Sequence, residues 1–132
     1  MRHYLYAAVI GACLISLFGS GAFAQGYTGN YNGTYTASQL PGQTLRIGIY
    51  FKQLNQNTMT AQYATSSGVF GTCNGFVNGN VATMTCTNAT PTCPGTYRDR
   101  YTFSGNNVTW TYAGRDCLGN ETGNGSATKL PF

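Results

Sequence analysis

Two cysteines lie at equal distances from a Gly-Asn dipeptide, and this symmetry constrains the fold more than any other feature of the chain. If Gly79-Asn80 forms a two-residue hairpin turn, Cys73 lies directly opposite Cys86. Glycine and asparagine suit such a turn because they tolerate positive φ. Counting outward places the two cysteines at a non-hydrogen-bonded position, where Cα atoms are about 4.5 Å apart and a disulfide can form. The pattern therefore predicts two strands, their register and a bridge between them.

The N-terminal residues have the three parts of a secretory signal peptide. A short basic start is followed by an apolar run from Tyr4 to about Phe18, and small residues then end at Ala24 in an A-x-A cleavage pattern. We therefore expect residues 1–24 to be a cleaved signal peptide. Residues 25–132 would then form one secreted or periplasmic domain.

Two other interpretations of these residues stay open. The first is an uncleaved membrane anchor, although the apolar run is shorter than the roughly 20 residues that span a bilayer. The second is a lipoprotein, because residues 10–13 (Ile-Gly-Ala-Cys) loosely resemble a lipobox. Cleavage there would leave the apolar residues 14–18 exposed.

Cleavage after Ala24 removes one of the five cysteines and leaves an even number. Four cysteines in a secreted chain of this length are typical of two disulfides. The second bridge is predicted to join Cys93 and Cys117, because a hairpin turning at Gly105-Asn106 brings both to its open end. Each bridge is expected to add about 2–4 kcal/mol to the stability of a domain with a modest core.

Strand signals recur along residues 25–132, and no segment has sustained helical periodicity. The clearest is a strict alternation over residues 27–37, which places tyrosine, glycine and alanine on one face and asparagine and threonine on the other. Segments rich in glycine, asparagine, serine or proline separate the strands. The expected strands cover residues 27–37, 44–54, 58–66, 69–77, 81–88, 95–103, 107–114 and 121–130.

The strand spacing restricts the architecture to an all-β fold. Eight short strands at this spacing suit a β-sandwich or a barrel, and consecutive hairpins favour an antiparallel up-and-down meander. Closing eight strands into a small barrel removes the exposed edges and leaves room for side chains or one small ligand. We expect the closed barrel with two disulfides, with the β-sandwich as the alternative.

Both ends of the chain resemble small secreted bacterial β-barrel proteins. The opening motif is Gly29-x-Tyr31-x-Gly33-x-Tyr35, and the closing motif is Gly-Arg-Asp-Cys-x-Gly-x-Glu-x-Gly-x-Gly over residues 114–125. Proteins of that kind are mostly uncharacterised and resemble calycins in architecture, so the resemblance implies a fold and no activity. The chain lacks the G-x-W opening that a lipocalin would have.

The residues available for chemistry narrow the function classes. The one histidine, His3, lies in the signal peptide, so residues 25–132 offer no Ser-His-Asp or Cys-His system and no histidine-based metal site. Disulfide formation withdraws the cysteines from thiolate chemistry and from zinc. Six arginines and lysines oppose three acidic residues without any basic run, which disfavours nucleic-acid binding. We expect no cofactor, no metal and no enzymatic activity.

Two of the three acidic residues flank one predicted turn. Asp116 and Glu121 lie on either side of residues 118–120 and could approach each other. Such a pair could serve as the two carboxyl groups of a glycoside hydrolase. The simpler interpretation is that both are solvated loop charges.

The third acidic residue, Asp99, lies between two arginines. Its expected role is a cross-strand or surface ion pair. The alternative is a position in a polar barrel interior, because Asp99 shares a strand face with Tyr97 and Tyr101.

Aromatic residues are the stronger functional signal. Tyrosine and tryptophan offer apolar faces and polar tips that suit a sugar, an aromatic or a lipid-like ligand in a barrel mouth, although they could equally fill a core. We expect a non-enzymatic protein that binds a small apolar or sugar-like ligand. The alternatives are an envelope protein with a packed core that contacts a partner protein, and a carboxylate-dependent hydrolase. The candidate ligand-binding residues are Tyr97, Asp99, Tyr101, Trp110 and Tyr112.

Overall fold

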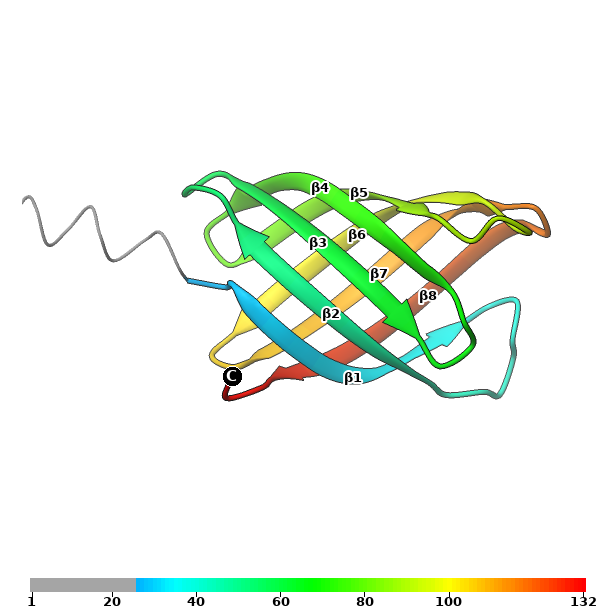
Figure 1. Cartoon of the computed structure of the whole chain (residues 1–132), viewed down its shortest axis with the longest axis horizontal. Helices are drawn as coiled ribbons and strands as arrows, with labels where there is room; N and C mark the ends of the chain where they lie inside the picture. Colours follow the sequence, from blue (N-terminus) through cyan, green and yellow to red (C-terminus); the bar gives the residue numbers. More distant parts are fainter. Residues whose placement is uncertain (1–25) are drawn as a thin grey trace, which may run out of the picture.

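The computed structural model describes residues 26–132, which form a closed barrel of eight antiparallel strands (Figure 1). Each strand pairs with the next along the chain, and β1 pairs with β8 to close the barrel. The up-and-down barrel is confirmed, and the sandwich alternative is wrong. The strands are β1 (Gly29–Ala37), β2 (Leu45–Gln53), β3 (Thr58–Thr65), β4 (Phe70–Asn78), β5 (Val81–Asn88), β6 (Gly95–Ser104), β7 (Asn107–Asp116) and β8 (Gly119–Lys129).

All eight predicted strands are present, with ends within two residues of those expected. The signal peptide expected over residues 1–24 lies outside the described residues. Within residues 26–132 there is no helix long and apolar enough to cross a membrane.

The predicted registers of two hairpins are confirmed. Cys73 lies opposite Cys86 and is bonded to it, with the two Cα atoms 4.0 Å apart. In the turn between them Gly79 has a φ of +62°, whereas Asn80 does not adopt a positive φ. This is the pattern of a type II′ turn, in which only the first central residue needs the left-handed conformation. The next hairpin pairs Phe103 with Val108, the register that the predicted turn at Gly105-Asn106 requires.

The connection between β7 and β8 is tighter than predicted. Strand β7 continues to Asp116 and β8 begins at Gly119, because these two residues pair directly. The backbone N–H of Leu118 donates to the side chain of Asp116 at 2.8 Å, a local contact of the kind that asparagine and aspartate form in turns. The Cys93–Cys117 disulfide is confirmed and joins this turn to the β5–β6 loop, with Cα atoms 5.1 Å apart.

One end of the barrel is filled by an aromatic plug, which we define as Tyr27, Tyr31, Phe51 and Phe103. Phe51 is fully buried and lies edge-on to Tyr31 and Phe103, with ring centroids 5.2 and 5.1 Å away. Tyr27, which precedes β1, stacks on Phe103 at 4.2 Å and donates a hydrogen bond to the carbonyl of Gly79 at 3.0 Å. These contacts close the end of the barrel that holds the β2–β3, β4–β5 and β6–β7 turns.

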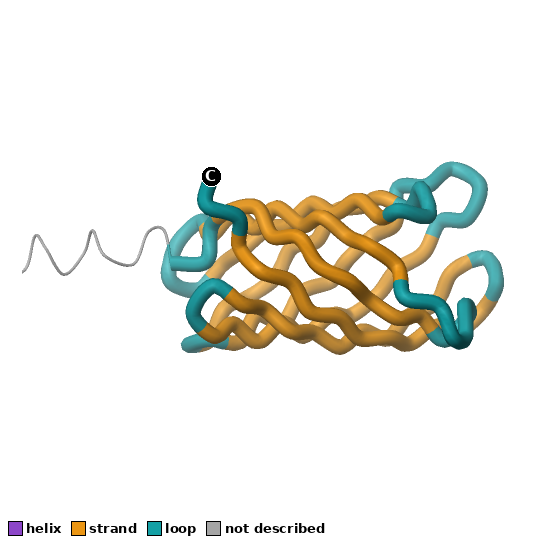
Figure 2. Tube along the Cα trace, turned by 90° about the horizontal axis from the view of Figure 1, so that it is seen from below, coloured by secondary structure: helices purple, strands orange, loops and turns teal. Residues whose placement is uncertain are grey.

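The remaining connections gather at the opposite end of the barrel (Figure 2). Since neighbouring strands are antiparallel, the β1–β2, β3–β4, β5–β6 and β7–β8 connections must all emerge there. No plug of stacked aromatic rings comparable to that around Phe51 fills this end within residues 26–132. Any internal space of the barrel is therefore expected here.

Candidate ligand-binding cavity

A cavity of about 280 Å³ lies inside the barrel at the end opposite the aromatic plug. Inward-facing side chains of the strands form its walls, and the four connections at that end form its rim. Small-molecule sites usually occupy about 300–1,000 Å³ and combine apolar walls with a few polar groups. At about 280 Å³ the cavity lies at the lower limit of this range, which suits a ligand smaller than a drug-sized molecule.

All five candidate residues line this cavity. Tyr97, Asp99 and Tyr101 alternate along β6, and Trp110 and Tyr112 alternate along β7. The rings of Tyr97 and Tyr112 meet edge-on with centroids 5.8 Å apart, and those of Tyr101 and Trp110 lie 5.7 Å apart at a tilt. The period of two along each strand correctly placed these side chains on one face.

The cavity also has lining residues that were not among the candidates. On the wall facing β6 and β7, Tyr35 and Tyr63 come from β1 and β3. The alternation of these two tyrosines with outward-facing residues along their strands could have predicted that they face the barrel interior. Gln39, Leu40 and Leu118 come from loops, where no periodicity indicates direction, so only the folded chain places them at the rim.

The aromatic rings of the wall lie on glycines of the neighbouring strand. Trp110 is paired with Gly125 and Tyr112 with Gly123. A Cβ atom added at Gly125 would lie 2.2 Å from Trp110 Cζ2, and one added at Gly123 would lie 2.4 Å from Tyr112 Cε1. Aromatic side chains that cover cross-strand glycines are a known device for curved sheets. Here the glycines let the rings lie flat and keep the cavity open.

Replacing Gly125 by alanine should displace Trp110 from the barrel wall. We expect the free energy of unfolding to fall by about 1–3 kcal/mol, the usual cost of inserting a methyl group into a packed site. Urea denaturation measures the loss, and the emission maximum of the single tryptophan reports the displacement. Gly48→Ala is the matched control, because its Cβ would contact only Asn32 Oδ1, at 3.4 Å. Equal losses in both variants would contradict this account.

Asp99 lies inside the barrel, so the expected cross-strand or surface ion pair is wrong. The side chain is only 8% exposed, whereas Arg98 and Arg100 lie on the outer face because residues alternate along β6. The hydroxyl of Tyr101 donates to Asp99 Oδ2 at 2.7 Å. Burial raises the pKa of Asp99 from 3.8 to about 6, against the opposing effect of the Tyr101 hydrogen bond.

Asp99→Asn should stabilise the protein at neutral pH. Because folding raises the pKa of Asp99, the folded chain keeps this proton between about pH 4 and 6 while the unfolded chain loses it. Stability is therefore lost as the pH rises through this window, by about 3 kcal/mol at 1.36 kcal/mol per pKa unit. Denaturation at pH 7.5 should show the variant to be more stable than the wild type by up to that amount, and the gain should shrink towards pH 4. A gain that does not depend on pH would be inconsistent with a buried, ionised Asp99.

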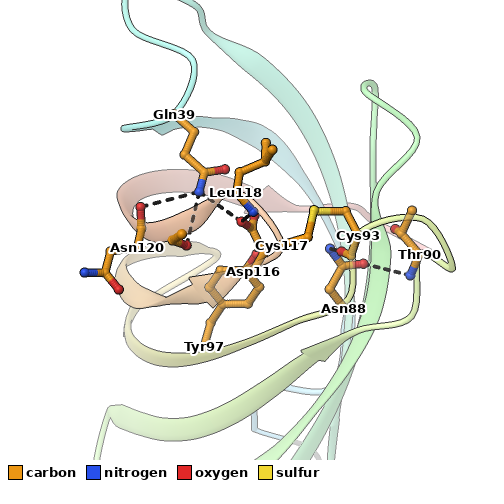
Figure 3. The surroundings of a disulfide bond; sticks show 10 residues. Gln39, Asn88, Thr90, Cys93, Tyr97, Asp116, Cys117, Leu118 and Asn120 are labelled. Carbon is orange, nitrogen blue, oxygen red and sulfur yellow. Dashed lines mark hydrogen bonds between the residues drawn. A yellow bond between two sulfur atoms is a disulfide. The ribbon is translucent and has the colours of Figure 1, made fainter.

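Asp116 is held at the rim of the cavity by three donors. Its Oδ1 atom accepts hydrogen bonds from Gln39 Nε2 at 3.0 Å and from the backbone N–H of Leu118 at 2.8 Å (Figure 3). Its Oδ2 atom accepts from the hydroxyl of Tyr97 at 3.1 Å. Asp116 thus joins the β1–β2 loop to the β7–β8 turn beside the Cys93–Cys117 disulfide.

Asp116 and Glu121 are neighbours, and their pKa values move in opposite directions. Burial and then the Asp116 carboxylate raise the pKa of Glu121. Burial also acts to raise the pKa of Asp116, but hydrogen bonds from Gln39, Leu118 and Tyr97 outweigh it and lower the value. The interpretation of both as solvated loop charges is therefore wrong, since they are half-buried and hydrogen-bonded.

The contact between these two carboxyl groups does not suit glycoside hydrolysis. Each carboxyl group lies close enough to the other to shift its pKa. Glycosidases hold their two carboxyl groups roughly 5–9.5 Å apart, on either side of the bond to be cleaved. Two carboxyl groups that interact this closely do not match that arrangement.

Two groups of side chains in residues 26–132 have the proximity of metal ligands, but each contains a disulfide. They are Cys73, Cys86 and Asp99, and Cys93, Asp116 and Cys117. A bridged sulfur is not the thiolate that binds metals. In these two groups only the carboxylates of Asp99 and Asp116 therefore remain available to a ligand.

Comparison with known proteins yields a fold and no family. Neither a protein-family model nor a curated protein matches the sequence. Among solved structures, the chain is similar to EF1p2_mFAP2b bound to DFHBI, with 18% identity, a TM-score of 0.64 and coverage of 81% of this chain and 96% of that one. It is also similar to the redesigned β-barrel mFAP1 bound to DFHBI, with 20% identity, a TM-score of 0.62 and coverage of 80% and 97%. The chain thus shares the β-barrel fold of these structures.

Proposed function

We propose that this protein is a non-enzymatic binding protein that holds a small, largely apolar molecule in the open end of its barrel. The observation that carries the proposal is the difference between the two ends. Aromatic rings plug one end, whereas the rings at the other end lie against the wall and surround a cavity of about 280 Å³. A barrel that only contacts an envelope partner would need no such space. For that reason the ligand is favoured over the packed-core alternative.

The similar structures support the proposal by analogy. Both mFAP proteins were solved with DFHBI bound. A barrel of this architecture can therefore accommodate a small molecule, although the identity of 18–20% transfers no ligand to this chain.

We further propose that the protein works outside the cytoplasm, in the periplasm or as a secreted protein. The signal-peptide pattern ending at Ala24 supports this compartment. The two disulfides support it as well, because such bridges persist in oxidising surroundings.

Titration with N-phenyl-1-naphthylamine, an uncharged dye that brightens in apolar surroundings, tests the proposed function. The wild type should increase the dye's emission in a saturable way. Ala37→Phe should abolish the increase, because Ala37 lines the cavity and the larger side chain would extend into it. Ala113→Phe, on the outer face of β7, is the matched control and should leave it intact. Melting curves confirm that both variants fold. Binding that survives in folded Ala37→Phe would refute the cavity as the site.

A further inference from the structure

The acidic residues of the chain are all collected at one place. The sequence contains three aspartates and glutamates, and all three, Asp99, Asp116 and Glu121, line the cavity. None of the lysines and arginines in residues 26–132 lines it. The domain carries a net positive charge, whereas the side chains that line the cavity include only negative charges. The interior of the open end therefore attracts cations and repels anions.

One carboxylate oxygen of Asp99 lacks a hydrogen-bond donor. The side chain is more than nine-tenths buried, and its Oδ2 atom is bonded to the Tyr101 hydroxyl. Its Oδ1 atom is also buried and has no hydrogen-bond partner in the described part of the chain. Buried carboxylate oxygens are normally satisfied, and an N–H donor of positive charge makes the stronger kind of bond. Asp99 lines the cavity, so a ligand bound there can supply that donor if the carboxyl group turns toward it.

The surroundings of Asp99 suit a cation with an apolar body. Tyr101, whose hydroxyl is bonded to Asp99, lines the cavity together with Trp110, and the centroids of these two rings are 5.7 Å apart. Tyr63 lies close enough to Asp99 for its pKa to respond to the Asp99 charge. Aromatic faces attract ammonium groups and pack against hydrocarbon. These tyrosines are neutral at physiological pH, and burial and then the Asp99 charge raise the pKa of both Tyr63 and Tyr101 further above its ordinary value. They add aromatic surface without adding negative charge.

We propose that the ligand of this cavity is a small protonated amine with an aromatic or apolar body, whose ammonium group donates to Asp99 Oδ1. Asp116 and Glu121, at the rim, attract the cation into the cavity. The rings of Tyr101 and Trp110 then contact its hydrocarbon part. This inference rests on the proposed function and narrows it, since a neutral sugar offers the carboxylates no opposite charge and an anion would be repelled.

Three probes of nearly equal size and different charge test the inference. They are 2-phenylethylamine, 2-phenylethanol and 3-phenylpropanoate, titrated calorimetrically at pH 7.5. The amine should bind at least about tenfold more tightly than the alcohol, which corresponds to one charge-assisted hydrogen bond. The carboxylate should not bind measurably. Quenching of Trp110, the only tryptophan, should accompany amine binding.

Two variants locate the preference. Asp99→Asn should bring the affinity for the amine to within about threefold of that for the alcohol, and should leave the alcohol's affinity unchanged. Arg98→Gln changes a charge on the adjacent residue of β6, outside the barrel, and should preserve the preference. If the alcohol or the carboxylate binds as tightly as the amine, the inference is overturned, while binding of the dye still upholds the proposed function. If the dye binds and none of the three probes does, the inference is likewise overturned and the proposed function is upheld. Failure of the dye as well would overturn both.

Discussion

Phe51→Ala should lower the free energy of unfolding by about 3–5 kcal/mol, the loss usual for a fully buried phenylalanine. Phe51 is the centre of the aromatic plug and has no exposed surface. Its ring lies edge-on to Tyr31, Phe103 and Tyr101, with centroids 5.0–5.2 Å away, so the substitution removes three aromatic contacts as well as the buried area. Urea denaturation with an unchanged m-value measures the loss.

Phe76→Ala is the control for this prediction. Phe76 is also on a strand, but it faces outward and is 72% exposed. Its removal should change the free energy of unfolding by no more than about 0.5 kcal/mol, as is usual for surface positions. Comparable losses in the two variants would mean that the plug does not anchor the barrel.

Replacing Cys73 and Cys86 together by alanine should lower the stability by about 3 kcal/mol and the melting temperature by roughly 10–20 °C. The bridge closes a loop with a sequence separation of 13, and its removal releases the unfolded chain from that constraint. Alanine is preferred to serine because both positions are buried, where a hydroxyl group would need a partner. Differential scanning calorimetry measures the shift.

Reduction of the wild type provides the matching control for the cysteine variant. A strong reductant opens both disulfides of the wild type and the remaining Cys93–Cys117 disulfide of the double variant. In reductant the two proteins should therefore have similar melting temperatures. The reduced wild type should also melt below the double variant measured without reductant. Intact-mass measurement of the folded wild type should show no free thiols among Cys73, Cys86, Cys93 and Cys117. Free thiols, or an unchanged melting temperature in the double variant, would contradict the structural role of the bridge.

The barrel was predictable because several local signals agree. The spacing of Cys73 and Cys86 about Gly79-Asn80 determined one register, and the same counting from Gly105-Asn106 placed Tyr101 opposite Trp110. Period-two alternation then assigned the faces of the strands. The turn between β7 and β8 was predicted at residues 118–120, later than its true position. No residue pattern in the sequence indicates that Asp116 pairs directly with Gly119.

The candidate site was predictable only as a set of side chains on one face. The tripeptide Arg98-Asp99-Arg100 suggested an ion pair, since charged residues are usually exposed. The structure shows that barrel closure overrides this preference and turns Asp99 inward. Whether the interior is filled or open depends on the summed volumes of inward side chains from all eight strands. The rings that cover Gly123 and Gly125 line the cavity at one end, whereas the rings around Phe51 contact one another and fill the other end.

The most direct test of the central claim, that the open end of the barrel is a ligand site, is amide and indole chemical-shift mapping by NMR with 2-phenylethylamine and 2-phenylethanol. The account predicts saturable shifts for the indole N–H of Trp110 and for the amides of Asp99, Tyr101 and the β5–β6 and β7–β8 connections. Amides at the plugged end, around Tyr27 and Phe103, should not move. Shifts confined to the outer face or to the plugged end would contradict it, as would the absence of shifts with these probes and with N-phenyl-1-naphthylamine.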